Sequence, residues 1–277
     1  MNKDFIEDEN NGKVAVILCG GPGSRMGSLV SDTPKTLLKV HGKPILWYIF
    51  WRLYKCGFRK IVLPLGYEGE QIEDYIKGLS SNTNCEIIAV KTGMDTTIAK
   101  RIDLISNIIH DDSDFFLLNS DTIFDFDIEK MYQLHTSTNS LITLSAVEVA
   151  SPWGIMSVKD EELVGFARDR RVSKLSSGEA KDGYGLVNSG LAWINKSSLE
   201  LIELDDCPDF ETTLYQKVID IKRASHFQIK GLWIPFDTPK DLNTINLTVE
   251  DELTHSVVAR DVLRKFELEL EKSGNRN

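Results

Sequence analysis

A glycine-rich segment with one arginine is the first part of the chain whose residues could do chemistry. It reads GGPGSRM over residues 20–26, and a Pro34-Lys35 pair follows it. Glycines let a backbone approach a ligand closely, and exposed N–H groups at the carboxyl end of a strand commonly cradle phosphates. Arginine and lysine side chains beside such a cradle can neutralise phosphate oxygens. The pattern therefore predicts a phosphate-binding loop.

Two familiar phosphate loops do not fit this segment. The dinucleotide-binding pattern G-x-G-x-x-G would need a glycine at Met26, and a P-loop would need G-K-[ST] after a four-residue gap, which the segment lacks. A dehydrogenase and a P-loop hydrolase are therefore disfavoured. A purely structural turn remains an alternative, but such a turn has no need of Arg25 or Lys35.

Alternating strand and helix patterns surround the loop. Strands are expected over 13–19, 60–65, 85–90 and 115–118, and helices over 44–56, 70–79 and 97–109. The first helix opens with Pro44 and stops at Gly57, which is the usual punctuation of a helix. This alternation predicts an α/β fold with a Rossmann-like, doubly wound, mixed but mainly parallel sheet and right-handed crossovers.

The pattern changes in the second half of the chain. Strands are expected over 141–149, 154–158, 163–167, 186–194 and 226–234, and helices over 128–135 and 210–221. We expect these strands to extend the same sheet, apart from a small excursion. The predicted organisation is a flexible N-terminal segment over 1–12, a single domain over 13–250, and a C-terminal helix and tail over 251–277.

The tail between residues 253 and 272 has apolar residues roughly on one side of a charged helix. They are Val257, Val258, Val262, Leu263, Phe266 and Leu270. Such a face predicts either a helix docked on its own domain or a contact between copies of the chain in a homo-oligomer.

Composition limits the classes of function. The 277 residues carry a formal net charge of −10, which argues against a nucleic-acid partner. No apolar run approaches the roughly 18 residues of a membrane span, and the acidic N-terminus does not resemble a signal peptide. Four scattered cysteines without a C-x-x-C pair fit buried thiols in a reducing compartment. We therefore expect a cytoplasmic protein that contacts neither nucleic acid nor membrane.

The loop and the Pro-Lys pair resemble the signature of a known protein family. G-G-x-G-[ST]-R-[ML] followed by Pro-Lys is the signature of sugar-1-phosphate nucleotidyltransferases, whose fold is shared with glycosyltransferases of the A type. The middle of the chain is similar to glucose-1-phosphate cytidylyltransferases in GKPILW over 42–47, in GYEG over 66–69 and in the spacing of Thr92-Gly93 and Arg101. The stretch from Trp233 to Thr238 resembles the late W…DT motif of the family.

The resemblance implies a reaction and a set of site residues. A sugar phosphate would attack the α-phosphate of a nucleoside triphosphate, and pyrophosphate would leave. Catalytic roles fall on Arg25 and Lys35, and a Mg²⁺ cofactor on Asp121 and Asp237. The residues implied to bind the nucleotide are Leu18, Gly20, Gly21, Gly23, Ser24, Arg25, Thr92, Arg101 and Ser120. Those implied to meet the sugar phosphate are Asn188, Arg168 and Arg170.

Several of these residues have a purely structural alternative. Arg25 could pair with a surface carboxylate, and Asp121 could cap the turn after its strand. Asp237 could be the N-cap of a helix that starts near Thr238. Arg101 could donate to the carbonyl of the base or simply face solvent. The five histidines have no ligand spacing and are expected to be surface or structural residues.

The chain departs from the family pattern at two places. Ser120 stands where the family usually has a glycine before its first metal aspartate. The family's Glu-Lys-Pro motif, whose lysine meets the sugar phosphate, corresponds here to GFARDRR over 165–171, which has neither lysine nor proline. An arginine of this stretch is expected to replace that lysine, which leaves open an unusual sugar phosphate or another phosphorylated acceptor.

Three hypotheses follow. The first is an active nucleotidyltransferase with CTP as the favoured nucleotide and GTP or UTP as alternatives. The second is a nucleotide-binding regulatory subunit without turnover, against which the presence of Arg25, Lys35 and both aspartates argues. The third is a glycosyltransferase that uses the Asp125-x-Asp127 pair, although Asp127 is better interpreted as the N-cap of the helix over 128–135.

Overall fold

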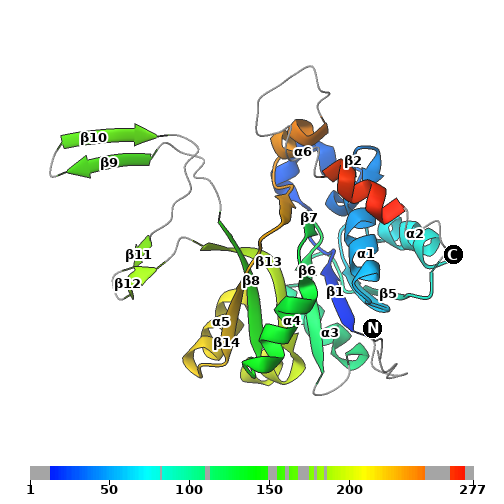
Figure 1. Cartoon of the computed structure of the whole chain (residues 1–277). Coiled ribbons are helices and arrows are strands. Elements are labelled where there is room, and N and C mark those ends of the chain that lie inside the picture. Colours follow the sequence, from blue (N-terminus) through cyan, green and yellow to red (C-terminus); the bar gives the residue numbers. More distant parts are fainter. Residues whose placement is uncertain are drawn as a thin grey trace, which may run out of the picture.

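Seven strands form the central sheet of the computed structural model (Figure 1). They are β1 (Val14–Leu18), β4 (Lys60–Leu65), β5 (Glu86–Lys91), β6 (Asp114–Asn119), β8 (Ile142–Glu148), β13 (Leu186–Asn195) and β14 (Ala224–Gln228). Their order is β14-β8-β13-β6-β1-β4-β5. Only β13 among them runs antiparallel to its neighbours, β6 and β8. The predicted mixed, mainly parallel sheet is confirmed.

The structure describes residues 13–81, 83–109, 113–148, 155–159, 162–167, 175–177, 180–183, 186–246 and 263–271. The predicted flexible segment over 1–12 lies outside these residues, and so do Arg168 and Arg170. In the described part of the chain, no helix is long and apolar enough to cross a membrane. All four cysteines are described, and each is a free thiol.

Helices cover both faces of the sheet. They are α1 (Ile45–Lys55), α2 (Gly69–Ser80), α3 (Ile98–Ile105), α4 (Ile128–Ser137) and α5 (Phe210–Asp220). Successive residues of a strand point to opposite faces, so Ala15 and Ile17 of β1 join the apolar cluster under α1, α2 and α4. Val14 and Val16 join the cluster under α3 and α5. Because both faces are covered, the inner strands β1, β4 and β6 are mostly apolar runs.

The strand expected over 226–234 is wrong as one element. It is two strands, β14 and β15 (Leu232–Pro235), and β15 leaves the sheet to pair antiparallel with β7 (Thr122–Asp125). Gly231 stands at the change of direction, where a Cβ would lie 2.1 Å from the carbonyl oxygen of Asp125. This small ribbon has a functional consequence because β7 follows Asp121 and β15 precedes Asp237.

The expected excursion consists of two hairpins. Strand β9 (Ile155–Lys159) pairs with β10 (Glu162–Ala167), and β11 (Leu175–Ser177) pairs with β12 (Ala180–Gly183). Figure 1 shows both hairpins apart from the seven-stranded sheet. After the excursion, the chain returns to the sheet with β13, which begins at Leu186.

A helix over 263–271 near the end of the chain docks on its own domain. Leu263, Phe266 and Leu270 are buried in the cluster that α1 also joins. The Glu267 carboxylate accepts hydrogen bonds from the Tyr48 hydroxyl of α1 and, at 2.9 Å, from Nδ1 of His41. The prediction of a docked helix is confirmed for these residues, while Val257, Val258 and Val262 lie outside the described part.

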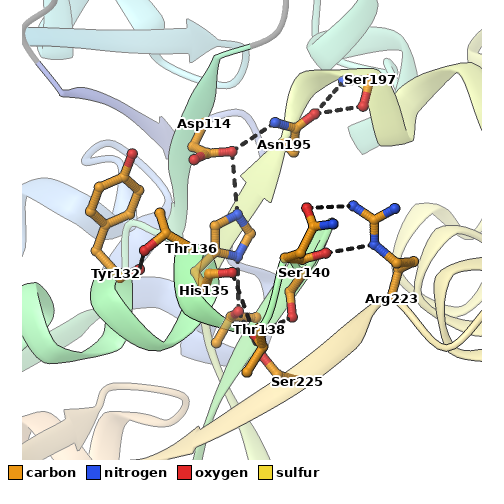
Figure 2. Close-up of polar contacts among 12 residues, drawn as sticks. Asp114, Tyr132, His135, Thr136, Thr138, Ser140, Asn195, Ser197, Arg223 and Ser225 are labelled. Carbon is orange, nitrogen blue, oxygen red and sulfur yellow. Dashed lines mark hydrogen bonds and ion pairs between the residues drawn. The ribbon is translucent and has the colours of Figure 1, made fainter.

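At the amino-terminal end of β6, a polar network joins β6, α4 and β13 (Figure 2). Asp114 at the start of β6 accepts hydrogen bonds from Nδ2 of Asn195 at 2.8 Å and from Nε2 of the buried His135 at 3.3 Å. Nδ1 of His135 contacts the Thr143 hydroxyl at 2.8 Å. Burial alone would raise the pKa of Asp114, but the hydrogen bonds from His135 and Asn195 outweigh it and hold the pKa below its usual value.

Asp114→Asn is expected to lower the free energy of unfolding by about 1–3 kcal/mol at neutral pH, because charge-assisted hydrogen bonds are lost. A folded-state pKa below the unfolded value of about 3.9 means that the stabilisation is present above that value and is lost as the pH falls through the folded pKa. Urea unfolding of both proteins should therefore show a difference at neutral pH that shrinks in acid. A difference that grows with acidity would contradict this assignment.

Candidate active site

A pocket opens at the carboxyl ends of β1 and β6. Its cavity volume is about 590 Å³, which lies within the usual range of small-molecule sites. Its walls come from residues 20–25, 94–98 and 119–121, together with Leu18, Lys35 and Arg101. Ligands of open α/β sheets bind outside the carboxyl ends of the strands. The segments that the sequence analysis assigned to the nucleotide thus meet in one cavity.

The predicted phosphate loop forms one wall of this pocket. Gly23 has a φ of 63°, a left-handed conformation that favours glycine, and its carbonyl accepts a hydrogen bond of 2.8 Å from the Met26 backbone N–H. A 3-10 helix over Ser24–Val30 follows and buries Met26. Arg25 stays exposed on this helix, so its guanidinium can reach a ligand.

Two positively and two negatively charged side chains converge at the mouth of the pocket. Nζ of Lys35 lies 2.6 Å from Oδ2 of Asp121 and 3.6 Å from Oδ1 of Asp237. Nη1 of Arg25 lies 3.1 Å from the same Oδ1 of Asp237. We call Arg25, Asp237, Lys35 and Asp121 the charge cluster. The alternative that Arg25 pairs with a carboxylate is confirmed, but that carboxylate is a predicted metal ligand.

The ribbon of β7 and β15 places the two aspartates side by side. The backbone N–H of Phe236 donates to the carbonyl oxygen of Asp121 at 3.0 Å, next to the last pair of the β15–β7 ladder. Asp237 follows Phe236 directly. Residues more than a hundred positions apart in the chain therefore present their carboxylates to the same ammonium group.

The helix-cap alternative for Asp237 is wrong. Helix α6 (Pro239–Asn246) begins with a reciprocal capping arrangement between Thr238 and Asp241. The Asp241 carboxylate accepts from the backbone N–H groups of Asp237 and Thr238, at 3.0 and 2.7 Å. The Thr238 hydroxyl in turn accepts from the Asp241 N–H at 3.4 Å. Because these two residues cap the helix, the Asp237 carboxylate faces Arg25 and Lys35.

Arg101 is buried at the base of the pocket, so the alternative that it faces solvent is wrong. Only 3% of the residue is exposed, and burial lowers the pKa of its guanidinium from the usual value. Nη2 donates to the carbonyl oxygens of Gly20 at 3.1 Å and Met94 at 3.2 Å. Nη1 donates to the carbonyl oxygen of Leu65 at 3.3 Å and to the Thr92 hydroxyl. Thr92 is buried behind Arg101 and does not line the pocket.

Asn188 is placed outside the pocket walls. Its Oδ1 accepts a hydrogen bond of 3.0 Å from the Gly190 N–H, at an irregularity in the β13–β8 ladder. Gly190 packs closely on Asn119, because a Cβ there would lie 2.5 Å from the Asn119 amide nitrogen. Asn188 therefore belongs to a segment that touches the pocket wall, although it does not itself line the cavity.

Seven residues that line the cavity were not among the predicted site residues: Pro22, Met94, Asp95, Thr96, Thr97, Ile98 and Asn119. Asn119 ends β6 immediately before Ser120 and Asp121 and lines the cavity with them. Its position at the carboxyl end of a buried strand is a signal that could have identified it. Asp95 lines the opposite wall and is exposed. The only sequence feature that pointed to it is its place between Thr92 and Arg101.

The Asp125-x-Asp127 pair does not belong to the pocket. Asp125 forms an ion pair of 2.9 Å with Nη2 of Arg52, and the Asp127 side chain accepts from the Lys130 N–H at 3.0 Å as the N-cap of α4. The predicted cap role of Asp127 is confirmed. Since both carboxylates have structural partners and neither lines the cavity, the glycosyltransferase hypothesis loses its motif.

Comparisons with known proteins agree with this geometry. The family model described as nucleotidyl transferase matches residues 14–252. A probable glucose-1-phosphate cytidylyltransferase of Bacillus subtilis is 26% identical over 84% of this chain and 94% of its own length. A D-glycero-alpha-D-manno-heptose 1-phosphate guanylyltransferase of Aneurinibacillus thermoaerophilus is 28% identical over 88% of this chain and 99% of its own length.

Solved structures support the fold. The crystal structure of a putative glucose-1-phosphate thymidylyltransferase from Bacillus anthracis has a TM-score of 0.67 at 17% identity, covering 91% of this chain and 96% of that one. Such a likeness shows the architecture, while the family model spans most of the chain from β1 to beyond α6. Together with the phosphate loop and the charge cluster at the strand ends, this match shows that the chain belongs to the nucleotidyl transferase family.

Proposed function

We propose that the chain transfers a nucleoside monophosphate from a nucleoside triphosphate to a sugar 1-phosphate and releases pyrophosphate. The charge cluster at the mouth of the pocket is the observation that carries this proposal. Phosphoryl and nucleotidyl transfers need alignment of the reacting oxygens and compensation of anionic charge more than covalent help. A sugar phosphate is already ionised at neutral pH, so the site needs no general base.

The two cations of the cluster have different exposure and therefore different roles. The Arg25 side chain is 74% exposed, and its planar fork can chelate the β- and γ-phosphates above the glycine loop. The Lys35 side chain is 11% exposed and lies deeper, beside Asp121. It supplies a point charge at the α-phosphate, where negative charge must be stabilised as the attacking oxygen arrives.

The two aspartates fit a magnesium ion. Their carboxylates approach one ammonium group at 2.6 and 3.6 Å, so they face a common point that a cation can occupy. Mg²⁺ prefers oxygen ligands and binds through one or two carboxylates with waters and substrate phosphates. Asp121 and Asp237 would hold this ion, which when bound would neutralise phosphate oxygens and orient them. Lys35 and Arg25 would then turn from the carboxylates towards the phosphates.

We propose CTP as the nucleotide, with GTP as the alternative. The spacing of Thr92-Gly93 and Arg101 resembles cytidylyltransferases, and a cytidylyltransferase and a guanylyltransferase are both among the relatives. The exposed Asp95 carboxylate in the pocket wall favours a base that presents an amino group. Cytosine, guanine and adenine have such a donor, whereas uracil and thymine offer one ring N–H flanked by two carbonyl oxygens that a carboxylate repels. The choice of cytosine and guanine over adenine comes from the relatives.

The acceptor would lie on the β13 side of the pocket. Asn188 is two residues from Gly190, which packs on the pocket residue Asn119. We propose that Asn188 meets the sugar and that Arg168 or Arg170 replaces the lysine of the family's Glu-Lys-Pro motif at the sugar phosphate. Pyrophosphate release measured with a panel of sugar 1-phosphates and four nucleoside triphosphates tests the whole reaction. Absence of release from every pair would contradict the proposed function.

Asp237→Asn should leave the fold intact and reduce turnover at low Mg²⁺ by about a hundredfold, because one of two carboxylates available to the ion is lost. Pyrophosphate release against Mg²⁺ concentration measures the effect. Asp127→Asn, which changes an N-cap carboxylate away from the pocket, is the matched control. Near-normal turnover of Asp237→Asn at low Mg²⁺ would remove Asp237 from the metal site.

Arg25→Ala and Lys35→Ala should each cost on the order of 3 kcal/mol in transition-state stabilisation, the scale of one lost charge-stabilising group. The measured quantity is kcat/KM, which should fall about a hundredfold or more. Arg25 is exposed, so its variant should melt at nearly the wild-type temperature. If kcat/KM of Arg25→Ala fell by less than about threefold, the ion pair of Arg25 with Asp237 would be a structural contact only.

Thermal shift with CTP, GTP, UTP and ATP, each with Mg²⁺, should rank CTP first. Stabilisation by a ligand follows its affinity by mass action. UTP should stabilise the protein less than CTP does, because its base offers no amino group to Asp95. A larger shift with GTP than with CTP would replace the cytidylyltransferase by a guanylyltransferase, and a larger shift with UTP would contradict the role given to Asp95.

A further inference from the structure

The Arg101 guanidinium has no terminal N–H left for a ligand. Each terminal nitrogen carries two hydrogens, and Nη1 and Nη2 each donate to two protein oxygens. Gly20 covers the remaining nitrogen, because a Cβ on that glycine would lie 2.4 Å from Nε. Arg101 therefore lines the pocket, but all its terminal N–H groups donate to acceptors of the protein.

The backbone acceptors of Arg101 belong to three different segments, two of which line the pocket. Gly20 is the first residue of the phosphate loop, Leu65 ends β4, and Met94 belongs to the opposite wall. The 94–98 segment is otherwise held by local hydrogen bonds, such as that from the Thr96 hydroxyl to the Thr92 carbonyl oxygen at 2.5 Å. One buried cation thus connects the phosphate loop to the wall that faces it.

The glycines around Arg101 show how closely these segments pack. A Cβ on Gly20 would lie 2.1 Å from the guanidinium carbon of Arg101. On Gly66 it would lie 2.3 Å from the Gly20 carbonyl oxygen and 2.8 Å from both terminal nitrogens of Arg101. Distances this short leave no room for a side chain at either position. The guanidinium therefore packs directly on the ends of β1 and β4, which the sheet already pairs with each other.

We propose that Arg101 is a positioning residue that holds the 94–98 segment against the phosphate loop and so sets the width of the nucleotide pocket. The base is then read by the 94–98 segment and not by Arg101. This inference rests on the proposed function, because it takes a nucleoside triphosphate as the ligand of the pocket. It predicts that replacement of Arg101 weakens the binding of both the base and the triphosphate.

Arg101→Lys tests this inference, since lysine keeps the charge but cannot bridge three segments with a planar fork. Calorimetric titration with Mg²⁺ measures the Kd of CTP, GTP and inorganic tripolyphosphate. We expect all three to bind about tenfold or more weakly, since misplaced walls degrade every contact, and the ratio between CTP and GTP to approach one. Arg59→Lys is the matched control, because Arg59 donates to backbone carbonyls of Tyr54 and Phe58 at the opposite end of β4.

Other outcomes would overturn the inference. Weaker binding of one nucleotide with unchanged tripolyphosphate binding would make Arg101 a direct ligand of the base. A lower melting temperature with unchanged Kd values would leave Arg101 a purely structural residue. Unchanged binding by Arg101→Lys, with normal binding by the wild type, would refute the inference alone. A wild type that binds no nucleotide would refute the proposed function together with it.

Thr92→Val provides a second, milder variant. Valine keeps the shape of the side chain and removes the hydroxyl that accepts from Arg101 and donates to the Leu65 carbonyl oxygen at 2.8 Å. The positioning role predicts a loss of affinity in the same direction for nucleotide and tripolyphosphate, and smaller than that of Arg101→Lys. Full affinity for both ligands in Thr92→Val would contradict the proposed link, whether or not Arg101→Lys folds.

Discussion

The Lys35 ammonium between the Asp121 and Asp237 carboxylates is the interaction on which the rest of the site depends. Two carboxylates that face a common point repel each other unless a cation lies between them, and a mostly buried ammonium is costly unless it is paired. Lys35 meets both requirements at once when no ligand is bound. A strand ribbon, a helix cap and the turn that carries Lys35 must all be in place for these three groups to meet.

The fold supplies these conditions with local devices. The β7–β15 ribbon lies outside the main sheet, yet it fixes the position of Phe236 against Asp121 and thereby of Asp237. Thr238 and Asp241 complete the cap of α6, which leaves the Asp237 carboxylate available to the cluster. On the other side, a single turn over Lys35–Leu37 after Pro34 directs the lysine inward. Each device is short, and none requires a change in the central sheet.

Local pattern predicted much of this architecture because parallel sheets have strong local signals. Buried strands are continuous apolar runs, so β1, β4 and β6 were expected within a residue or two of their observed bounds. The split into β14 and β15 was not expected, since it depends on Gly231 packing against Asp125, a contact between distant segments. The role of Asp237 was open for the same reason: its sequence fits a helix cap, and only the Thr238–Asp241 pair decides against it.

Residues of the candidate site were predicted where the motif is local and missed where the pocket is assembled from different segments. Gly20, Gly23, Arg25 and Lys35 lie within one stretch, and the structure brings all four to the pocket. Asp95 enters the pocket only through the arrangement of segments in space, whereas Asn119 also has a local signal in its place at the end of a buried strand. Thr92 is the converse case, because a residue predicted to bind the nucleotide is buried behind Arg101.

The three cations of the pocket differ in how fully the protein satisfies them, and that difference decides what each can do. Arg101 is buried and bound to fixed backbone carbonyls, so moving it would break several hydrogen bonds at once. Arg25 is mostly exposed and has one carboxylate partner, which a solvated phosphate can replace at little cost. Lys35 lies between these extremes: its partners are carboxylates that a bound divalent ion would itself neutralise. Under the proposed function, arrival of a triphosphate with its ion would therefore free Lys35 and Arg25 for the phosphates while Arg101 stays in place, and the scaffold of the pocket would not have to move when the charges are exchanged.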